Sequence, residues 1–124
     1  MTIIDSCGWL EYFANGANAD FFSTPIKENS EIIVPTVILY EIWKKISRER
    51  GEDKAIELVA QLKRYRIIPL DEELSISAAK VSSENNFAMA DSIIYATARA
   101  QNATLWTQDE HFKGIEGVEY IEKA

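Results

Sequence analysis

The sequence predicts an α/β domain in which helices cover both faces of a mostly parallel sheet. Short runs of apolar, β-branched residues alternate with longer amphipathic segments along the whole chain. The short runs are continuously apolar, as expected of strands buried on both faces. The chain has 124 residues, 47% of them hydrophobic, and no repeat or linker. A chain of this size can build one real core, so we expect residues 1–124 to form a single domain.

The first part of the chain predicts one strand followed by short helices. Thr2–Asp5 is typical of a buried strand, and Ser6 is placed to cap a helix that runs to Phe13. The NGAN stretch breaks that helix. A short helix over Ala19–Phe22 is expected next, after which Ser23–Pro25 indicates either a bend or a new helix start.

The middle of the chain predicts a strand and a pair of helices. Ile32–Val34 is a compact β-branched strand, and Thr36 is a suitable N-cap for a long helix that ends near Glu49. Gly51 ends this helix. Lys54–Tyr65 has the apolar periodicity of a second amphipathic helix.

The last part of the chain continues the alternation. Arg66–Leu70 is expected as a strand, Glu72–Glu84 as a helix, and Asn85 and Asn86 as a break. An alanine-rich helix is expected over Met89–Asn102. The final strands are expected at Ala103–Trp106 and Val118–Ile121.

Four carboxylates lie far apart in the sequence, each at the edge of an apolar run: Asp5, Glu41, Asp91 and Asp109. An acid beside buried structure costs free energy unless it is hydrated, paired or bound to a cation. Asp5 and Asp109 each follow a predicted strand, and sites in parallel sheets form beyond the carboxyl ends of the strands. If the fold brings all four together, a divalent metal must offset their repulsion. Oxygen ligands suit magnesium or manganese, which indicates phosphate chemistry.

Each carboxylate also has an ordinary structural interpretation. Glu41 has Lys44 and Lys45 at i+3 and i+4, which would make a weak surface helix pair. Asp91 could be a favourable charge at a helix start, and Asp109 a turn former. Asp5 has the weakest alternative, because an acid that ends a buried strand needs a partner. Their joint placement therefore carries more weight than any single residue.

The neutral residues near these acids have two interpretations each. The hydroxyls of Ser6 and Thr107 could orient a carboxylate or a metal-bound water, or they could serve as an N-cap and a strand-end hydrogen bond. Cys7 could be a nucleophile with His111, the only histidine, as its base. We favour a surface or loop position for His111.

Charge and composition limit the classes of protein that fit. The net charge of −7 argues against a protein that coats nucleic acid by charge alone, but it does not exclude a nuclease. The basic residues gather in Lys44–Arg50 and Lys63–Arg66. The single cysteine rules out an internal disulfide, and no apolar run approaches the roughly 20 residues of a membrane span. No signal peptide is visible, so a cytoplasmic protein is expected.

The motifs IIDSCGWLEYF, VPTVILYEIWKK and MADSIIYATARAQNATLWTQDEHF, with the final short strand, together resemble the PIN-domain ribonuclease family. The resemblance is closest to the VapC-type toxins of toxin–antitoxin modules and runs along nearly the whole chain. The DSIIYATA segment and the TxDxxF element formed by Thr107, Asp109 and Phe112 are its most specific parts.

This resemblance implies a three-layer α/β/α domain with a central parallel sheet that cleaves single-stranded RNA with magnesium or manganese. It also implies a cognate antitoxin and a homodimer. The acidic quartet of the family falls on Asp5, Glu41, Asp91 and Asp109, and its hydroxyls fall on Ser6 and Thr107. Two other functions stay open at this point, which are a PIN-like RNA-binding or regulatory module that barely cuts and a magnesium-dependent phosphatase.

An antitoxin would need an apolar groove on this chain. Four aromatic residues are candidates for its lining, with ordinary core packing as the alternative: Trp9, Tyr12, Phe13 and Trp43.

Overall fold

The computed structural model describes residues 1–124 as strands that alternate with helices, and it confirms the predicted α/β class. The strands are β1 (Thr2–Ile4), β2 (Ile33–Pro35), β3 (Arg66–Ile68), β4 (Thr104–Thr107) and β5 (Val118–Tyr120). The helices are α1 (Ser6–Phe13), α2 (Ala19–Lys27), α3 (Thr36–Arg50), α4 (Glu52–Leu62), α5 (Glu72–Asn85) and α6 (Met89–Ala100), with a 3₁₀ turn, η1, at Glu110–Phe112.

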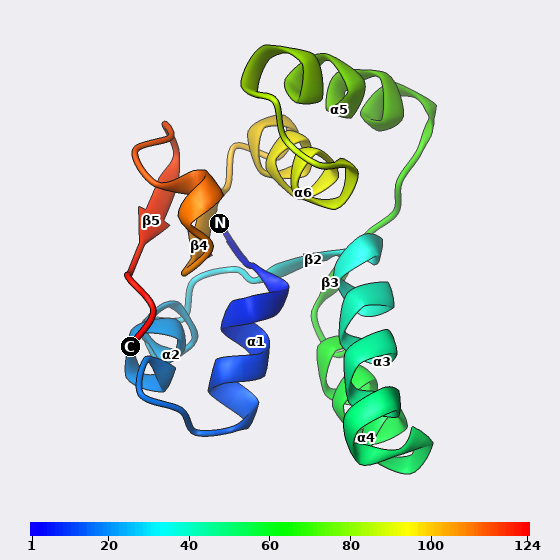
Figure 1. Ribbon diagram of the computed structural model, residues 1–124, viewed down its shortest axis with the longest axis vertical. Coiled ribbons are helices and arrows are strands. Elements are labelled where there is room, and N and C mark those ends of the chain that lie inside the picture. Colours follow the sequence, from blue (N-terminus) through cyan, green and yellow to red (C-terminus); the bar gives the residue numbers. More distant parts are fainter.

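All the strand pairs are parallel. One sheet has the order β1-β4-β5, the other pairs β2 with β3, and a parallel bridge between Thr2 and Ile32 joins them. The strands therefore follow the order β3-β2-β1-β4-β5, with β1 and β4 side by side. In Figure 1, α5 and α6 lie on one side of the strands and α1 to α4 on the other, which is the predicted three-layer arrangement.

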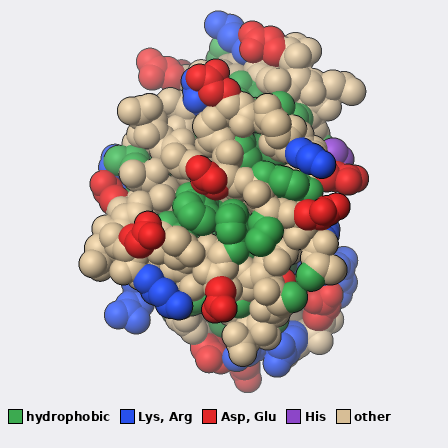
Figure 2. All heavy atoms as spheres, turned by 90° about the vertical axis from the view of Figure 1, so that its left-hand side faces the viewer, with side chains coloured by type: hydrophobic (Ala, Val, Ile, Leu, Met, Phe, Trp, Pro, Cys, Tyr) green, Lys and Arg blue, Asp and Glu red, His purple; other side chains and the backbone are tan.

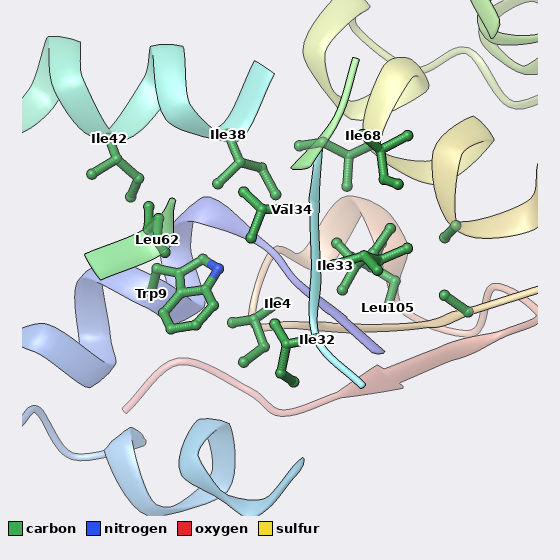
Figure 3. Close-up of a cluster of buried hydrophobic side chains, with 14 of the residues drawn as sticks. Ile4, Trp9, Ile32, Ile33, Val34, Ile38, Ile42, Leu62, Ile68 and Leu105 are labelled. Atoms are coloured by element: carbon green, nitrogen blue, oxygen red, sulfur yellow. The ribbon is translucent and has the colours of Figure 1, made fainter. Parts of the chain in front are cut away.

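The core is built where the strands meet α1 and α3. Ile4 and Ile33 are fully buried in the strands, and Ile38 and Ile42 of α3 point toward them (Figure 3). Trp9 of α1 closes the cluster and is 1% exposed. Each such side chain contributes about 1.5–3 kcal/mol by leaving water. This packing fixes α1 and α3 against the sheet. Two of the candidate acids, Asp5 and Asp109, come just after the strands β1 and β4.

Gly8 allows α1 to approach the sheet closely. A Cβ atom at this position would lie 2.6 Å from the Phe22 ring and 2.8 Å from Ile4. Any larger residue would push the helix away from β1. Because Asp5 joins β1 to α1, the glycine also helps to set the position of this acid.

Two predicted N-caps are wrong. Asp5, not Ser6, caps α1, since its Oδ1 accepts a hydrogen bond from the backbone N–H of Ser6 at 2.8 Å. Thr36 is the first residue of α3 rather than its cap, and Pro35 precedes it without a side-chain cap bond. A carboxylate accepts from a helix N-terminus at least as well as a hydroxyl does, so Asp5 takes the capping position that the sequence also offered to Ser6.

One predicted boundary is also wrong. The segment Ser23–Pro25 is neither a bend nor a new start, because α2 continues through it to Lys27. Phe22 and Pro25 are both buried, and this packing outweighs the backbone hydrogen bond that proline cannot make. The other boundaries differ from the prediction by no more than three residues.

Candidate active site

The parallel pairing of β1 and β4 brings Asp5 and Thr107 together. The backbone N–H of Asp5 donates to the carbonyl of Trp106 at 3.0 Å, which continues the ladder one residue past β1. The Thr107 hydroxyl then donates to Asp5 Oδ2 at 2.8 Å and accepts from the backbone N–H of Asp109 at 2.9 Å. One hydroxyl therefore ties two of the predicted acids to each other.

Asp5 is a buried carboxylate that forms no ion pair with a basic side chain. It is 3% exposed, and its two oxygens accept from Ser6 and Thr107. Burial raises its pKa from 3.8 to about 6, and the charges of Asp91 and Asp109 add to the increase, although both hydrogen bonds lower it. The environment therefore opposes the charged form of this group.

Glu41 reaches the same site from α3. Its Oε1 is buried without a hydrogen-bond partner. Burial raises its pKa, and the negative charges of Asp5, Asp91 and Asp109 raise it further, while the Ser6 hydroxyl lowers it. A buried carboxylate oxygen without a partner is costly, so this atom is available to a ligand.

The interpretation of Glu41 as a surface helix pair is wrong. Lys44 lies over the ring of Tyr40, with its Nζ 5.7 Å from the ring centre. Lys45 pairs with Glu49 at 3.1 Å. Both lysines therefore have partners on the exposed side of α3, while Glu41 turns toward the other acids.

Asp91 and Asp109 meet at the side chain of His111. Asp91 lies in the first turn of α6, and Asp109 caps η1 by accepting from the backbone N–H of His111 at 3.0 Å. The Nδ1 atom of His111 lies 3.0 Å from Asp109 Oδ1 and 3.4 Å from Asp91 Oδ2. One ligand atom from each of these three residues falls within 4.8 Å of the others.

The charges of this trio affect one another. Burial raises the pKa of Asp91, the charge of Asp109 raises it further, and His111 lowers it. The charge of Asp109 raises the pKa of His111, with a smaller contribution from Asp91. His111 is exposed, as expected, but its contact with both acids was missed. Its position two residues after Asp109, in a polar turn, was the only signal.

The structure thus brings the four predicted acids to one edge of the sheet. The donor set consists of carboxylate oxygens, one of which, Glu41 Oε1, is buried and unpartnered. Burial is the main cause of the raised pKa values, and repulsion between the acids adds to it. Hard divalent cations prefer carboxylate oxygens, and a cation would offset both effects. The residues present therefore fit Mg²⁺ or Mn²⁺.

The alternative of a Cys7–His111 nucleophile is wrong. The Cys7 thiol points at Asp5 Oδ2 at 3.6 Å and lies 3.5 Å from the Thr107 hydroxyl. Burial, together with the charge of Asp5, raises its pKa to about 12, so it stays a thiol at neutral pH. His111 contacts Asp91 and Asp109 instead.

Comparison with known proteins identifies the family of this fold. Residues 2–118 match the PIN domain, and the chain belongs to the PIN domain family. Among curated proteins, none matches the sequence. None of the helices is long and apolar enough to cross a membrane.

Several solved structures share the fold. A toxin–antitoxin complex from Klebsiella pneumoniae has a TM-score of 0.78 at 19% identity, with 96% of each chain covered. VapBC2 from Rickettsia felis, bound to a promoter DNA fragment, has a TM-score of 0.75 at 17% identity, and the match covers 98% of this chain and 97% of that one. VapC20 from Mycobacterium tuberculosis, described as a sarcin–ricin loop cleaving toxin, has a TM-score of 0.76 at 15% identity. The match covers 94% of this chain and 95% of that one. At these identities the likeness is one of fold.

Proposed function

We propose that this chain is a metal-dependent endoribonuclease that cleaves single-stranded RNA segments, and that it acts as the toxin of a type II toxin–antitoxin pair. The observation that carries the proposal is that Asp5, Asp91 and Asp109 lie close enough to Glu41 to raise its pKa, while Glu41 Oε1 is buried without a partner. Membership of the PIN domain family and the fold shared with VapC20 support it.

The four acids have two kinds of role in this proposal. Asp5, Asp91 and Asp109 hold Mg²⁺ or Mn²⁺, directly or through water, and Glu41 either ligates or positions the attacking water. The ion, when bound, makes a water more acidic and shields the scissile phosphate as negative charge builds up. Hydrolysis by water, without the RNA 2′-hydroxyl, leaves a 5′-phosphate and a 3′-hydroxyl.

Thr107 and Ser6 are positioning residues in this proposal. Thr107 fixes Asp5 through its hydroxyl and Asp109 through the backbone N–H of that residue. Ser6 holds the other oxygen of Asp5 with its backbone N–H, and its hydroxyl faces Glu41. Each group restrains a carboxylate without adding charge, as outer-shell partners of a metal site do.

The surface charge affects how RNA is bound. The net charge is −7, and Figure 2 shows several acidic and fewer basic side chains around an apolar patch on the face that lies to the left in Figure 1. Such a surface attracts the phosphate backbone weakly. Recognition therefore depends on the metal site and on splayed bases, which are accessible in single-stranded loops but hidden in an A-form helix.

An antitoxin segment is the proposed occupant of a hollow of about 360 Å³ at the far end of α1. Its lining is mainly aromatic and apolar: Trp9, Tyr12, Phe13, Gln61, Leu62, Arg64 and Tyr65. Trp43, also a candidate from the sequence, lies on α3 and does not line this hollow. An arginine of the antitoxin would suit the acid quartet, because its planar fork can bind a carboxylate at two points.

A second copy of the chain is the proposed partner for another apolar surface. A hollow of about 350 Å³ between α5 and α6 includes Leu70 and Met89, which are 43% and 77% exposed. Apolar side chains exposed in one place indicate an interaction surface. We place the resulting homodimer in the cytoplasm.

The test of the activity is cleavage by the purified protein of an RNA with exposed single-stranded segments. We expect cleavage in Mg²⁺ or Mn²⁺, none in EDTA, and products with 5′-phosphate and 3′-hydroxyl ends. Asp91→Asn, purified in parallel, controls for contaminating ribonucleases and should not cut.

Equal cleavage with and without chelator would contradict the metal mechanism. Metal-dependent RNA binding without cleavage would favour the RNA-binding or regulatory module. Release of phosphate from small phosphate esters, with RNA left intact, would favour the phosphatase.

A further inference from the structure

We propose that His111 is a ligand of this metal site and makes it select Mn²⁺ over Mg²⁺. The inference rests on the proposed function, because it concerns the same ion. It adds a nitrogen donor to a site for which the sequence offered only oxygen.

The distances around His111 are compatible with adjacent ligands on one ion. Ligands at about 2.1 Å from an octahedral ion lie about 3.0 Å from each other. The Nδ1 atom of His111 lies 3.0 Å from Asp109 Oδ1 and 3.4 Å from Asp91 Oδ2. An ion can therefore face all three atoms after only a small movement of the side chains.

The turn that presents the imidazole does not depend on the imidazole. The backbone N–H of His111 donates to Asp109 Oδ1, and the backbone N–H of Asp109 donates to Thr107. The next residue, Phe112, is fully buried and anchors the turn in the core. The His111 side chain itself is 66% exposed. Its removal should therefore leave the fold and the two acids in place.

The chemistry of the donor explains the selectivity. Mg²⁺ prefers oxygen ligands and keeps several waters, whereas imidazole binds more readily to transition metals. A site with Asp91, Asp109 and an imidazole nitrogen therefore gains more with Mn²⁺ than with Mg²⁺. Without the imidazole, only oxygen donors remain, and the difference in affinity between Mn²⁺ and Mg²⁺ should shrink.

A counter-ion role for His111 makes the opposite prediction. A protonated imidazole would neutralise Asp91 and Asp109 in the metal-free protein and would compete with any cation. Its removal would then tighten the binding of both metals. The two roles are therefore distinguished by the sign of the change.

The first measurement is calorimetric titration of the intact wild-type and His111→Ala proteins with Mn²⁺ and with Mg²⁺. We expect the Mn²⁺ affinity to fall by about tenfold or more, and the Mg²⁺ affinity to change much less. Glu110→Gln alters an exposed neighbour in the same turn and is the matched control. It should affect both metals equally.

The second measurement is electron paramagnetic resonance of bound Mn²⁺. Wild type should show coupling to an imidazole nitrogen, and His111→Ala should lose it. Mn²⁺ bound without nitrogen coupling, or tighter binding of both metals by the variant, would overturn the inference and leave the proposed function intact. No binding of either metal by the wild type would instead overturn the proposed function.

Discussion

The two ends of α1 differ in what they do for the fold. At its start, Asp5 is buried beside other acids, and its pKa is raised to about 6. Toward its end, Phe13, the last residue, stacks on Trp9 from the middle of the helix with ring centres 5.7 Å apart, and the ring centres of Trp9 and Tyr65 are 5.6 Å apart. Aromatic pairs of this kind stabilise the fold, whereas clustered like charges oppose it. One helix therefore joins a site kept at a cost to stability with a region that provides stability.

The cost at the acidic end is electrostatic. Asp5, Glu41 and Asp91 each have a raised pKa, with burial as the main cause and neighbouring acids adding to it. A protein that needed only stability would have no reason to keep these groups charged. Removing a charge from this end and removing a ring from the other end should therefore have opposite effects on stability.

The largest expected effect comes from truncation at the aromatic end. Trp9→Ala should lower the free energy of unfolding by about 3–5 kcal/mol, because it removes a large side chain that is only 1% exposed. Asp91→Asn should leave the metal-free stability unchanged or higher, because it removes a repelled charge, yet it should abolish cleavage. Urea denaturation in EDTA and the cleavage assay measure the two quantities.

Addition of metal sharpens the contrast between the same proteins. Mg²⁺ or Mn²⁺ should stabilise the wild type by binding linkage and stabilise Asp91→Asn less. A clear loss of stability for Asp91→Asn in EDTA would show that Asp91 is a structural hydrogen-bond acceptor, and the contrast between the two ends of α1 would fail.

The next effect is a pH dependence of stability caused by Asp5. Its pKa is 3.8 ordinarily and about 6 in the fold, so the folded state binds the proton more tightly than the unfolded state does. Relative stability is therefore highest below pH 3.8, falls as the pH rises toward 6, and stays low above it. A pKa shift of this size lowers the free energy of unfolding by about 3 kcal/mol between acid and neutral pH.

Asp5→Asn isolates this contribution, because the other groups titrate in both proteins. The asparagine oxygen can still accept from Ser6, and its amide can donate to the Thr107 hydroxyl. In metal-free buffer, the variant should gain stability relative to the wild type between acid and neutral pH. A difference that does not change with pH would mean that Asp5 is not the strained group.

The sequence predicted the fold and the four acids for a clear physical reason. Continuous apolar runs specify buried parallel strands, and acids placed directly after them must reach the same sheet edge. Asp5 and Asp109 followed from this rule. Glu41 and Asp91 were harder to place, because helix position alone also allows a surface role. The structure places both side chains beside other acids of the predicted site.

The contacts that sequence reasoning missed depend on local backbone conformation. Asp5 is an N-cap because of the turn between β1 and α1, and His111 reaches two acids because η1 is a 3₁₀ turn. Neither turn has a periodic signal. Trp43 was grouped with Trp9 by residue type, but the two lie on different helices, and only Trp9 lines the aromatic hollow.

The smallest expected effect is that of Tyr12→Ala, which tests the aromatic hollow as a binding surface. Tyr12 is only half-buried and lies at the edge of Trp9, with ring centres 6.0 Å apart. Tyr12→Ala should therefore perturb stability less than Trp9→Ala. It should still weaken binding of the proposed antitoxin by about 1–3 kcal/mol, because aromatic residues in hollows dominate such interfaces. Cleavage should stay unchanged, since Tyr12 lies near the end of α1, whereas Asp5 precedes its start.

Calorimetric titration with the proposed antitoxin measures this change, with Ile76→Ala as the control. Ile76 is 61% exposed on α5 and does not line the hollow, so its loss should leave partner binding unchanged. Tight binding by Tyr12→Ala, together with weakened binding by Ile76→Ala, would move the partner to the α5 side. The aromatic end of α1 would then stabilise the fold without binding a partner. The two ends of the helix would still differ in their effect on stability, but only the acidic end would have a function.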